Sequence, residues 1–376
     1  MIYVCYHCMN CSLAHFRNHE TGKSITTRDE NSNVKDVLVE CTGVTKNRGY
    51  ATIPLPSTDI LKFKTVRNGV RVAQIVTPNV RQIVRNQFDC QMLEGAELES
   101  ESYHPASESN SGDKHVDEFL GSEEHHMEAH GICISDHWER RLFKSDMMNP
   151  IVDPITSLNL ISPLTLAYFM DSGWYKVDVS QAAEADNWGR ASGCTFVEDT
   201  CLNEDGLVTS SNSPFFCSPD SSNEEISGCT DDLTRKASCA IYQFDNSLPV
   251  EYQYFKNTDT EMIGATLGGG DADLDYCPVY NAKTPLTDDP PLPSCKQEES
   301  KDWKVKRGEV FGMPNSRCVT AQVDSERTGL CVPIACAVTE RMLKVQVDGY
   351  WKDCETEGQL LQRWWNPNDF GKFVVE

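Results

Sequence analysis

The stretch that decides the fold is residues 135–194, SDHWERRLFKSDMMNPIVDPITSLNLISPLTLAYFMDSGWYKVDVSQAAEADNWGRASGC. It contains one histidine, His137, followed eleven residues later by Met148 in a Met-Met-Asn-Pro turn. A helix is expected next, because Ser162 is a good N-cap and a proline follows it at the first helical position. The helix is apolar on most sides and should be buried, and Gly173 is expected to end it.

A second helix is expected upstream of this stretch. Residues 72–76 are predicted to form a short strand, after which Thr77 is expected to cap a helix that begins at Pro78. The apolar residues that share one face of this helix are Val80, Ile83, Val84 and Phe88. Other short strands are predicted at residues 37–39, 310–313 and 343–347.

Length and charge exclude several classes of protein. A chain of 376 residues suits two or three domains and can bury a sizeable core. Its 57 acidic residues outnumber its 34 basic ones, giving a net charge of −23. Nucleic-acid binding is therefore not expected, because a phosphate backbone needs a basic face. No stretch reaches the ~18 apolar residues that span a bilayer, and the first 16 residues do not resemble a signal peptide.

Cysteine content points to an oxidising compartment. The 17 cysteines are mostly scattered rather than grouped in paired C-x-x-C motifs, which is typical of a disulfide framework in an exported protein. The pairing is left open, and an odd number leaves at least one thiol unpaired or paired outside the chain. Cys5, Cys8 and Cys11 have metal-binding or redox spacing, but three thiols without a fourth ligand make a weak case.

Several segments resemble the leishmanolysin family of zinc metalloendopeptidases, especially its animal, invadolysin-like branch. They occur in the family's order: FDCQMLEGAELE (88–99), SDHWERRLF (135–143), SPLTLAYFMDSGWYKVD (162–178), NWGRASGCTF (187–196), LPVEYQYF (248–255) and DADLDYCP (271–278). The resemblance implies a mixed α/β (α+β) fold, in which a metzincin-like C-terminal subdomain precedes a Cys-rich, mainly β C-terminal domain.

The same resemblance implies a zinc site and a hydrolytic function. In this family two histidines and a general-base glutamate come from an H-E-x-x-H helix, and a third histidine comes from a distant segment. By position, His137 matches the third zinc ligand, and Met148 matches the methionine of the turn beneath the metal. The implied cofactor is Zn²⁺ and the implied substrate is a protein or peptide. A secreted or cell-surface location with a role in cell adhesion is also implied, while a cytoplasmic location stays open.

The chain departs from the family at the catalytic helix, because it contains no H-E-x-x-H motif. In the family that motif lies shortly before a segment resembling residues 12–29, SLAHFRNHETGKSITTRD. The expectation is therefore a truncated chain that lacks two zinc-ligand histidines and the general-base glutamate. The alternative is a catalytically inactive relative that acts as a secreted or surface binding or adhesion protein.

Two other histidine pairs have ligand spacing. His15 and His19 lie four residues apart but have no glutamate after the first histidine. His126 and His130 form an alternative metal site together with His137. If they lay on a helix, Glu128 would point about 200° away from His126 and could not act beside the metal. A solvated acidic loop is the favoured interpretation of that pair.

The predicted organisation has five parts. They are a non-matching N-terminal tail (1–11), a remnant following the missing catalytic helix (12–98), an acidic, disordered insertion (99–131), a metzincin-type subdomain with the third histidine and the Met-turn (132–200), and the Cys-rich C-terminal domain (201–376). Without the covering helix, the face that bears His137, Met148 and Phe169 is expected to expose apolar surface. The oligomeric state is left open.

Overall fold

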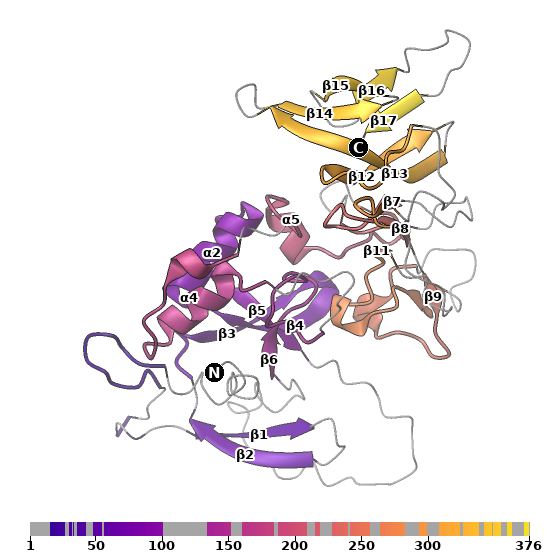
Figure 1. Ribbon diagram of the computed structural model, residues 1–376. Coiled ribbons are helices and arrows are strands. Elements are labelled where there is room, and N and C mark those ends of the chain that lie inside the picture. The colour runs from indigo at the N-terminus through magenta and orange to yellow at the C-terminus, as the bar shows by residue number, and fades with distance from the viewer. Residues whose placement is uncertain are drawn as a thin grey trace. The chain divides into compact units, whose positions relative to one another are not determined.

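The chain forms two compact units in the computed structural model, and each is described by itself (Figure 1). Unit 1 comprises residues 1–152 and 157–199, and unit 2 comprises residues 153–156 and 200–376. The structure describes residues 16–26, 30–31, 33, 36–42, 48–54, 56–100, 134–151, 160–183, 187–208, 215–218, 228–239, 241–255, 264–282, 293–298, 308–323, 326–337, 342–347, 349–354, 359–362 and 372–375. Helices combine with antiparallel sheets in these residues, which confirms the predicted mixed fold and its strand-rich C-terminal part.

A four-stranded antiparallel sheet forms the centre of unit 1. Its order is β3-β4-β5-β6. The strands are β3 (Leu61–Val66), β4 (Val70–Ile75), β5 (Ala96–Ser100) and β6 (Ile134–Trp138). A separate hairpin, β1 (Asp36–Thr42) with β2 (Arg48–Pro54), includes the strand predicted at residues 37–39.

The described residues of unit 1 also form three α-helices: α2 (Pro78–Phe88), α4 (Pro163–Asp171) and α5 (Gly193–Glu198). Helix α2 packs against both α4 and α5 (Figure 1). The predicted apolar face of α2 is confirmed, since Val80, Val84 and Phe88 are buried. The predicted start of α4 is also confirmed, because the Ser162 hydroxyl accepts the backbone N–H of Thr165 at 3.1 Å.

The N-terminus of α2 is capped differently from the prediction. Thr77 occupies the N-cap position, but its side chain makes no capping hydrogen bond. The Asp171 carboxylate, from the last turn of α4, instead accepts the backbone N–H groups of Asn79 and Val80 at 2.9 and 3.1 Å. A carboxylate suits this place, because the N-terminal end of a helix carries unpaired donors and partial positive charge. The cap therefore ties α4 to α2.

Substituting Asp171 with alanine is expected to destabilise unit 1 by about 1–2 kcal/mol, the usual cost of losing a helix N-cap. Urea denaturation followed by circular dichroism measures the change. Glu94→Ala is the control, because Glu94 makes an exposed ion pair with Lys62 at 3.6 Å, and such pairs contribute little. Equal stability of the two variants would count against the tertiary cap.

Ring packing and one disulfide hold α5 in place. The Cys90–Cys194 bond joins the residue shortly after α2 to the first turn of α5. Phe88 stacks on Phe196 with ring centroids 5.7 Å apart. Gly189 has a φ of +66°, and a Cβ there would lie 2.5 Å from the Phe196 ring and 2.8 Å from the Phe88 ring. Only glycine fits both the backbone conformation and the space beside these rings.

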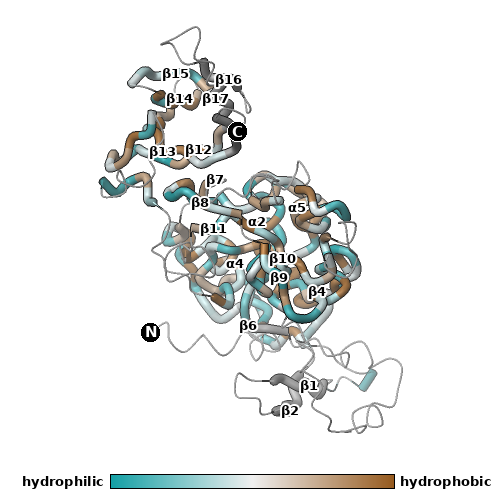
Figure 2. Tube along the Cα trace, turned by 90° about the vertical axis from the view of Figure 1, so that its right-hand side faces the viewer, coloured by the Kyte–Doolittle hydropathy of each residue, from teal (hydrophilic) through white to brown (hydrophobic). Residues whose placement is uncertain are grey.

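Unit 2 contains a curved six-stranded antiparallel sheet (Figure 2). Its order is β15-β14-β13-β12-β17-β16. The strands are β12 (Ser316–Val323), β13 (Glu326–Ala337), β14 (Met342–Val347), β15 (Tyr350–Cys354), β16 (Gln359–Gln362) and β17 (Lys372–Val375). One face buries an aliphatic core of Val319, Ala321, Leu330, Val332, Val345 and Val347. Strand β14 confirms the prediction at residues 343–347.

The described residues of unit 2 also contain short strands and four disulfides. The strands are β7 (Gly228–Cys229), β8 (Lys236–Cys239), β9 (Tyr242–Gln243), β10 (Leu267–Gly268) and β11 (Tyr280–Asn281). The disulfides are Cys201–Cys277, Cys217–Cys239, Cys229–Cys318 and Cys295–Cys331. The last two pack together as one buried cluster. A disulfide framework was expected from the sequence, and the structure contains one.

A fully buried ion pair lies beside these disulfides. Lys236 Nζ contacts both oxygens of the Glu309 carboxylate, at 2.6 and 2.7 Å. Glu309 also accepts the backbone N–H of Cys331 at 2.9 Å, which joins the pair to β13. The carboxylate therefore neutralises a lysine that has no access to water.

The strand predicted at residues 310–313 is absent from the structure. The backbone N–H of Val310 donates to Cys331 O at 2.8 Å, and that of Gly312 donates to Cys295 O at 3.0 Å. Gly312 has a φ of +81°, which breaks an extended run. The segment is therefore an irregular connection whose amides are paired without a strand. Across the described ranges, no helix combines the length and apolar character that crossing a bilayer requires.

Candidate functional site

His137 lies at an irregular point of the edge strand β6. Leu98 pairs with Trp138 and Ser100 pairs with Ile134, so two residues along β5 correspond to four along β6. The extra residues of this bulge lie between Ile134 and Trp138, where His137 is half-buried. Bulges of this kind re-aim side chains and are frequent beside active sites. The predicted ligand thus occupies a place where the backbone departs from regular pairing.

Met148 lies next to this strand in a tight turn. The backbone N–H of Trp138 donates to Met148 O at 3.0 Å, which brings the turn to the residue after His137. Asn149 stabilises the turn, because its side-chain amide donates to Lys144 O at 2.7 Å and to Asp146 O at 2.6 Å. The structure therefore brings together the two segments that carry the sequence-predicted residues His137 and Met148.

A buried carboxylate holds the turn. Asp146 accepts the backbone N–H of Met148 at 2.7 Å, and its exposed fraction is 5%. The Ser162 hydroxyl, at the N-cap of α4, donates to the same carboxylate. The Thr165 hydroxyl lies 2.9 and 3.0 Å from the two carboxylate oxygens, and it accepts the indole N–H of Trp138 at 3.0 Å. Strand β6, the turn and α4 are joined through this group.

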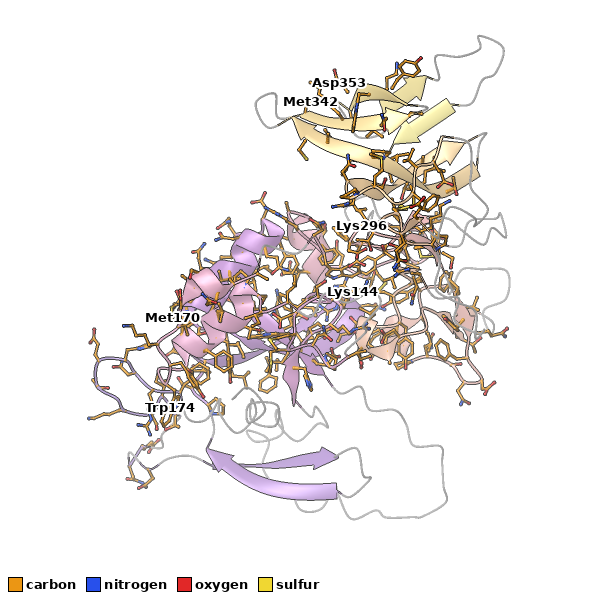
Figure 3. All side chains as sticks on the ribbon, in the orientation of Figure 1. Lys144, Met170, Trp174, Lys296, Met342 and Asp353 are labelled. Carbon is orange, nitrogen blue, oxygen red and sulfur yellow. A yellow bond between two sulfur atoms is a disulfide. The ribbon has the colours of Figure 1, made fainter. Side chains whose placement is uncertain are left out.

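The prediction of an exposed apolar face beside the site is wrong for Met148, whose exposed fraction is 5%. His137 and Phe169 are half-buried. The turn is bonded to β6 through Trp138 and to the buried Asp146 carboxylate, and the methionine side chain is buried there. Trp174 lies just beyond the C-terminal end of α4 (Figure 3). Both Trp174 and Tyr175 are half-exposed. Arg17 stacks on the Trp174 ring with its guanidinium carbon 3.7 Å from the centroid.

A buried polar layer supports the sheet, and the sequence did not predict it. Arg67 pairs with Glu97 at 2.7 Å and also donates to Val197 O at 3.1 Å. Arg141 donates to Phe196 O at 3.0 Å and to Asp199 O at 2.8 Å. Both guanidinium groups therefore bind carbonyls at the C-terminal end of α5, the end at which a helix favours positive charge. Arg141 belongs to a run of three consecutive charged residues, 139–141, and all three are buried.

The described residues do not make a complete metal site. They contain no group of three or more histidine, cysteine, aspartate or glutamate side chains that could hold a metal ion. Zinc in a catalytic site takes three protein ligands, and the sequence predicts only one of them, His137, among the described residues. The alternative ligands His126 and His130 lie outside the described residues, as do Cys5, Cys8 and Cys11.

Two described cysteines are not in disulfides. Cys336 is exposed, and Cys354 is half-buried. Leu343 pairs with Cys336 on one side and with Cys354 on the other, so two strand spacings separate the thiols. That separation of about 9–10 Å between Cα atoms exceeds the reach of a disulfide. Burial raises the pKa of the Cys354 thiol, which makes it a poor nucleophile or metal ligand at neutral pH.

Comparison with known proteins agrees with the segment matches. The profile of the leishmanolysin peptidase family matches residues 118–368. A leishmanolysin-like peptidase of Drosophila pseudoobscura pseudoobscura is 31% identical over 218 residues, which cover 57% of this chain and 27% of the relative. Leishmanolysin of Leishmania donovani is 31% identical over 221 residues, covering 57% of this chain and 33% of the relative.

A leishmanolysin-like peptidase of Caenorhabditis elegans is 30% identical over 216 residues, covering 55% of this chain and 28% of the relative. The matched region is thus a third or less of the length of each of these curated relatives. The family match covers most of the chain, includes both His137 and Met148, and continues through the disulfide-rich unit. The chain belongs to the leishmanolysin family of metallopeptidases.

Proposed function

We infer that this chain forms part of a zinc-dependent metalloendopeptidase, in which His137 is the third zinc ligand and Met148 lies beneath the metal. The observation that supports this most is the 3.0 Å hydrogen bond from Trp138 N–H to Met148 O, which joins the two predicted segments. The bulge at His137 adds support, since it departs from regular sheet pairing at the predicted ligand. The substrate is a protein or peptide.

The proposed location is extracellular or at the cell surface. Five disulfides are formed in the described residues, and such bonds persist in oxidising compartments. Disulfides would help a peptidase that acts outside the cell to remain folded there.

The test is to purify the natural protein from its source with an antibody against unit 2, and to measure its zinc content and its cleavage of casein. Near-stoichiometric zinc and cleavage that a chelator abolishes are expected. The same protein carrying His137→Ala should lose about 100-fold or more in kcat/KM, because losing a direct ligand costs at least as much as losing its supporting contacts. His19→Ala is the control, since His19 is exposed and bonds Met170 O at 2.9 Å. Full activity of the His137 variant would contradict the assignment.

A second candidate is an inactive relative that binds a protein or cell surface. It is favoured by the lack of any three-residue metal cluster within the described ranges, and by the exposed aromatic pair Trp174 and Tyr175. Tryptophan and tyrosine are common anchors of protein interfaces. Natural protein that holds no zinc and cleaves no substrate would support this candidate over the peptidase.

A further inference from the structure

We propose that Asp146 is the positioning residue of this site, because it sets the place of Met148 relative to the strand that carries His137. The proposal rests on the proposed function for its catalytic meaning. Asp146 holds three segments of unit 1 together. These segments are β6, the turn that contains Met148, and the first turn of α4.

The hydrogen bonds around Asp146 run in one direction. The backbone N–H of Met148 and the hydroxyls of Ser162 and Thr165 all have the Asp146 carboxylate as an acceptor within reach. The hydroxyl of Ser162 uses its own oxygen to accept Thr165 N–H, and that of Thr165 uses its oxygen to accept the Trp138 indole. Each hydroxyl proton is thereby left to point at the carboxylate.

A group that accepts from several donors at once needs a carboxylate rather than an amide. An ionised aspartate offers two oxygens and no proton, whereas asparagine would place an N–H₂ group against one of the donors. Burial strengthens these charge-assisted bonds and makes the loss of any one of them costly. The Asp146 side chain is 5% exposed, so water has little access to replace a missing bond.

Two series of hydrogen bonds connect Asp146 to the strand that contains His137. The first is direct, from the carboxylate to Met148 N–H and from Met148 O to Trp138 N–H. The second passes through the Thr165 hydroxyl to the Trp138 indole. Both routes end on Trp138, the residue after His137 and the one whose pairing with Leu98 closes the bulge. A change at Asp146 should therefore move His137 together with Met148.

The experiment uses the full chain labelled with ¹³C on methionine methyl groups and ¹⁵N on histidine rings. The Met148 and His137 signals are assigned by their loss in Met148→Leu and His137→Gln. In Asp146→Asn, both signals are expected to shift and broaden. Thr165→Val should shift the His137 signal less, since it interrupts one of the two routes.

Asp171→Asn is the matched control, because it weakens another carboxylate contact of α4, the one from Asp171 to the N-terminus of α2, and leaves the turn untouched. It should lower the melting temperature while leaving the His137 and Met148 signals unchanged. If Asp146→Asn lowers the melting temperature and leaves both signals unchanged, Asp146 is structural only and the proposal fails. If Asp146→Asn does not fold, unchanged signals in Thr165→Val overturn the proposal, and shifted ones support it. Full activity of His137→Ala would refute the proposed function without altering these spectra.

Discussion

Replacing both Cys229 and Cys318 by serine is expected to destabilise unit 2 by about 3–5 kcal/mol. Their disulfide joins β7 to β12 across 89 residues, and a bond that closes so long a loop removes much entropy from the unfolded chain. The bond also packs against Cys295–Cys331 in a buried cluster, so its loss leaves two hydroxyl groups among sulfur atoms.

Native-state hydrogen exchange of β12 and β13 in the full chain measures this change, because their amides should exchange through global unfolding of unit 2. Removing Cys217–Cys239, which closes only 22 residues, should cost less. Cys336→Ser is the control, since that thiol is exposed and forms no disulfide, and a change within about 0.5 kcal/mol is expected. Protection in the Cys229 and Cys318 variant equal to that of the control would refute the prediction.

Arg141→Met is expected to destabilise unit 1 by about 3–5 kcal/mol. The substitution keeps much of the apolar stem and removes a fully buried guanidinium that donates to Phe196 O and Asp199 O. Two hydrogen bonds from a charged donor are then lost, a buried one to Phe196 O and a part-buried one to Asp199 O, at about 1–3 kcal/mol each. The substitution also removes a cation–π contact, because the Arg141 guanidinium carbon lies 5.7 Å from the centroid of the Phe196 ring.

Urea denaturation followed by tryptophan fluorescence measures the effect, because the buried Trp188 indole donates to Arg141 O at 2.8 Å and should report on this region. Arg190→Met is the matched control, since Arg190 is exposed and lies two residues after Trp188. We expect that control to remain within about 0.5 kcal/mol of the parent chain. A loss below 1 kcal/mol for Arg141→Met would mean that water or another donor replaces the guanidinium.

Local signals in the sequence predicted the elements that are specified locally. Ser162 and its following proline define the start of α4, and the apolar spacing of residues 80–88 defines the buried face of α2. Scattered cysteines indicated disulfides, although the pairing depends on the folded chain and was not predictable. The ordered segment matches identified the family, which the profile match over residues 118–368 confirms.

Features that depend on distant residues were beyond local signals. Thr77 occupies the predicted N-cap position of α2, but the capping bonds come from Asp171, which lies 91–92 residues away in the sequence. At residues 310–313 the apolar content favoured a strand, yet Gly312 has a φ of +81° and the amides pair elsewhere. The burial of Arg141 could not be predicted from its neighbours in the sequence, because its carbonyl acceptors belong to another segment.

The candidate site was predicted in part. Family position indicated His137 and Met148, and the structure places their segments side by side; their role as ligand and floor stays a prediction. The bulge at His137 depends on the register with β5, which a single strand does not reveal. Asp146 gave no signal, since an aspartate before two methionines resembles an ordinary turn residue.

The connection between β5 and β6 has a consequence for how such a chain can change over evolutionary time. Strand β5 ends at Ser100 and β6 begins at Ile134, so residues 101–133 join two strands that pair directly. Closing a longer flexible loop costs entropy only with the logarithm of its length, so a loop of this many residues would cost about 2 kcal/mol more to close than a four-residue turn. Insertions and deletions here should therefore be tolerated, while the pairing of Ser100 with Ile134 and of Leu98 with Trp138 keeps β6 in place.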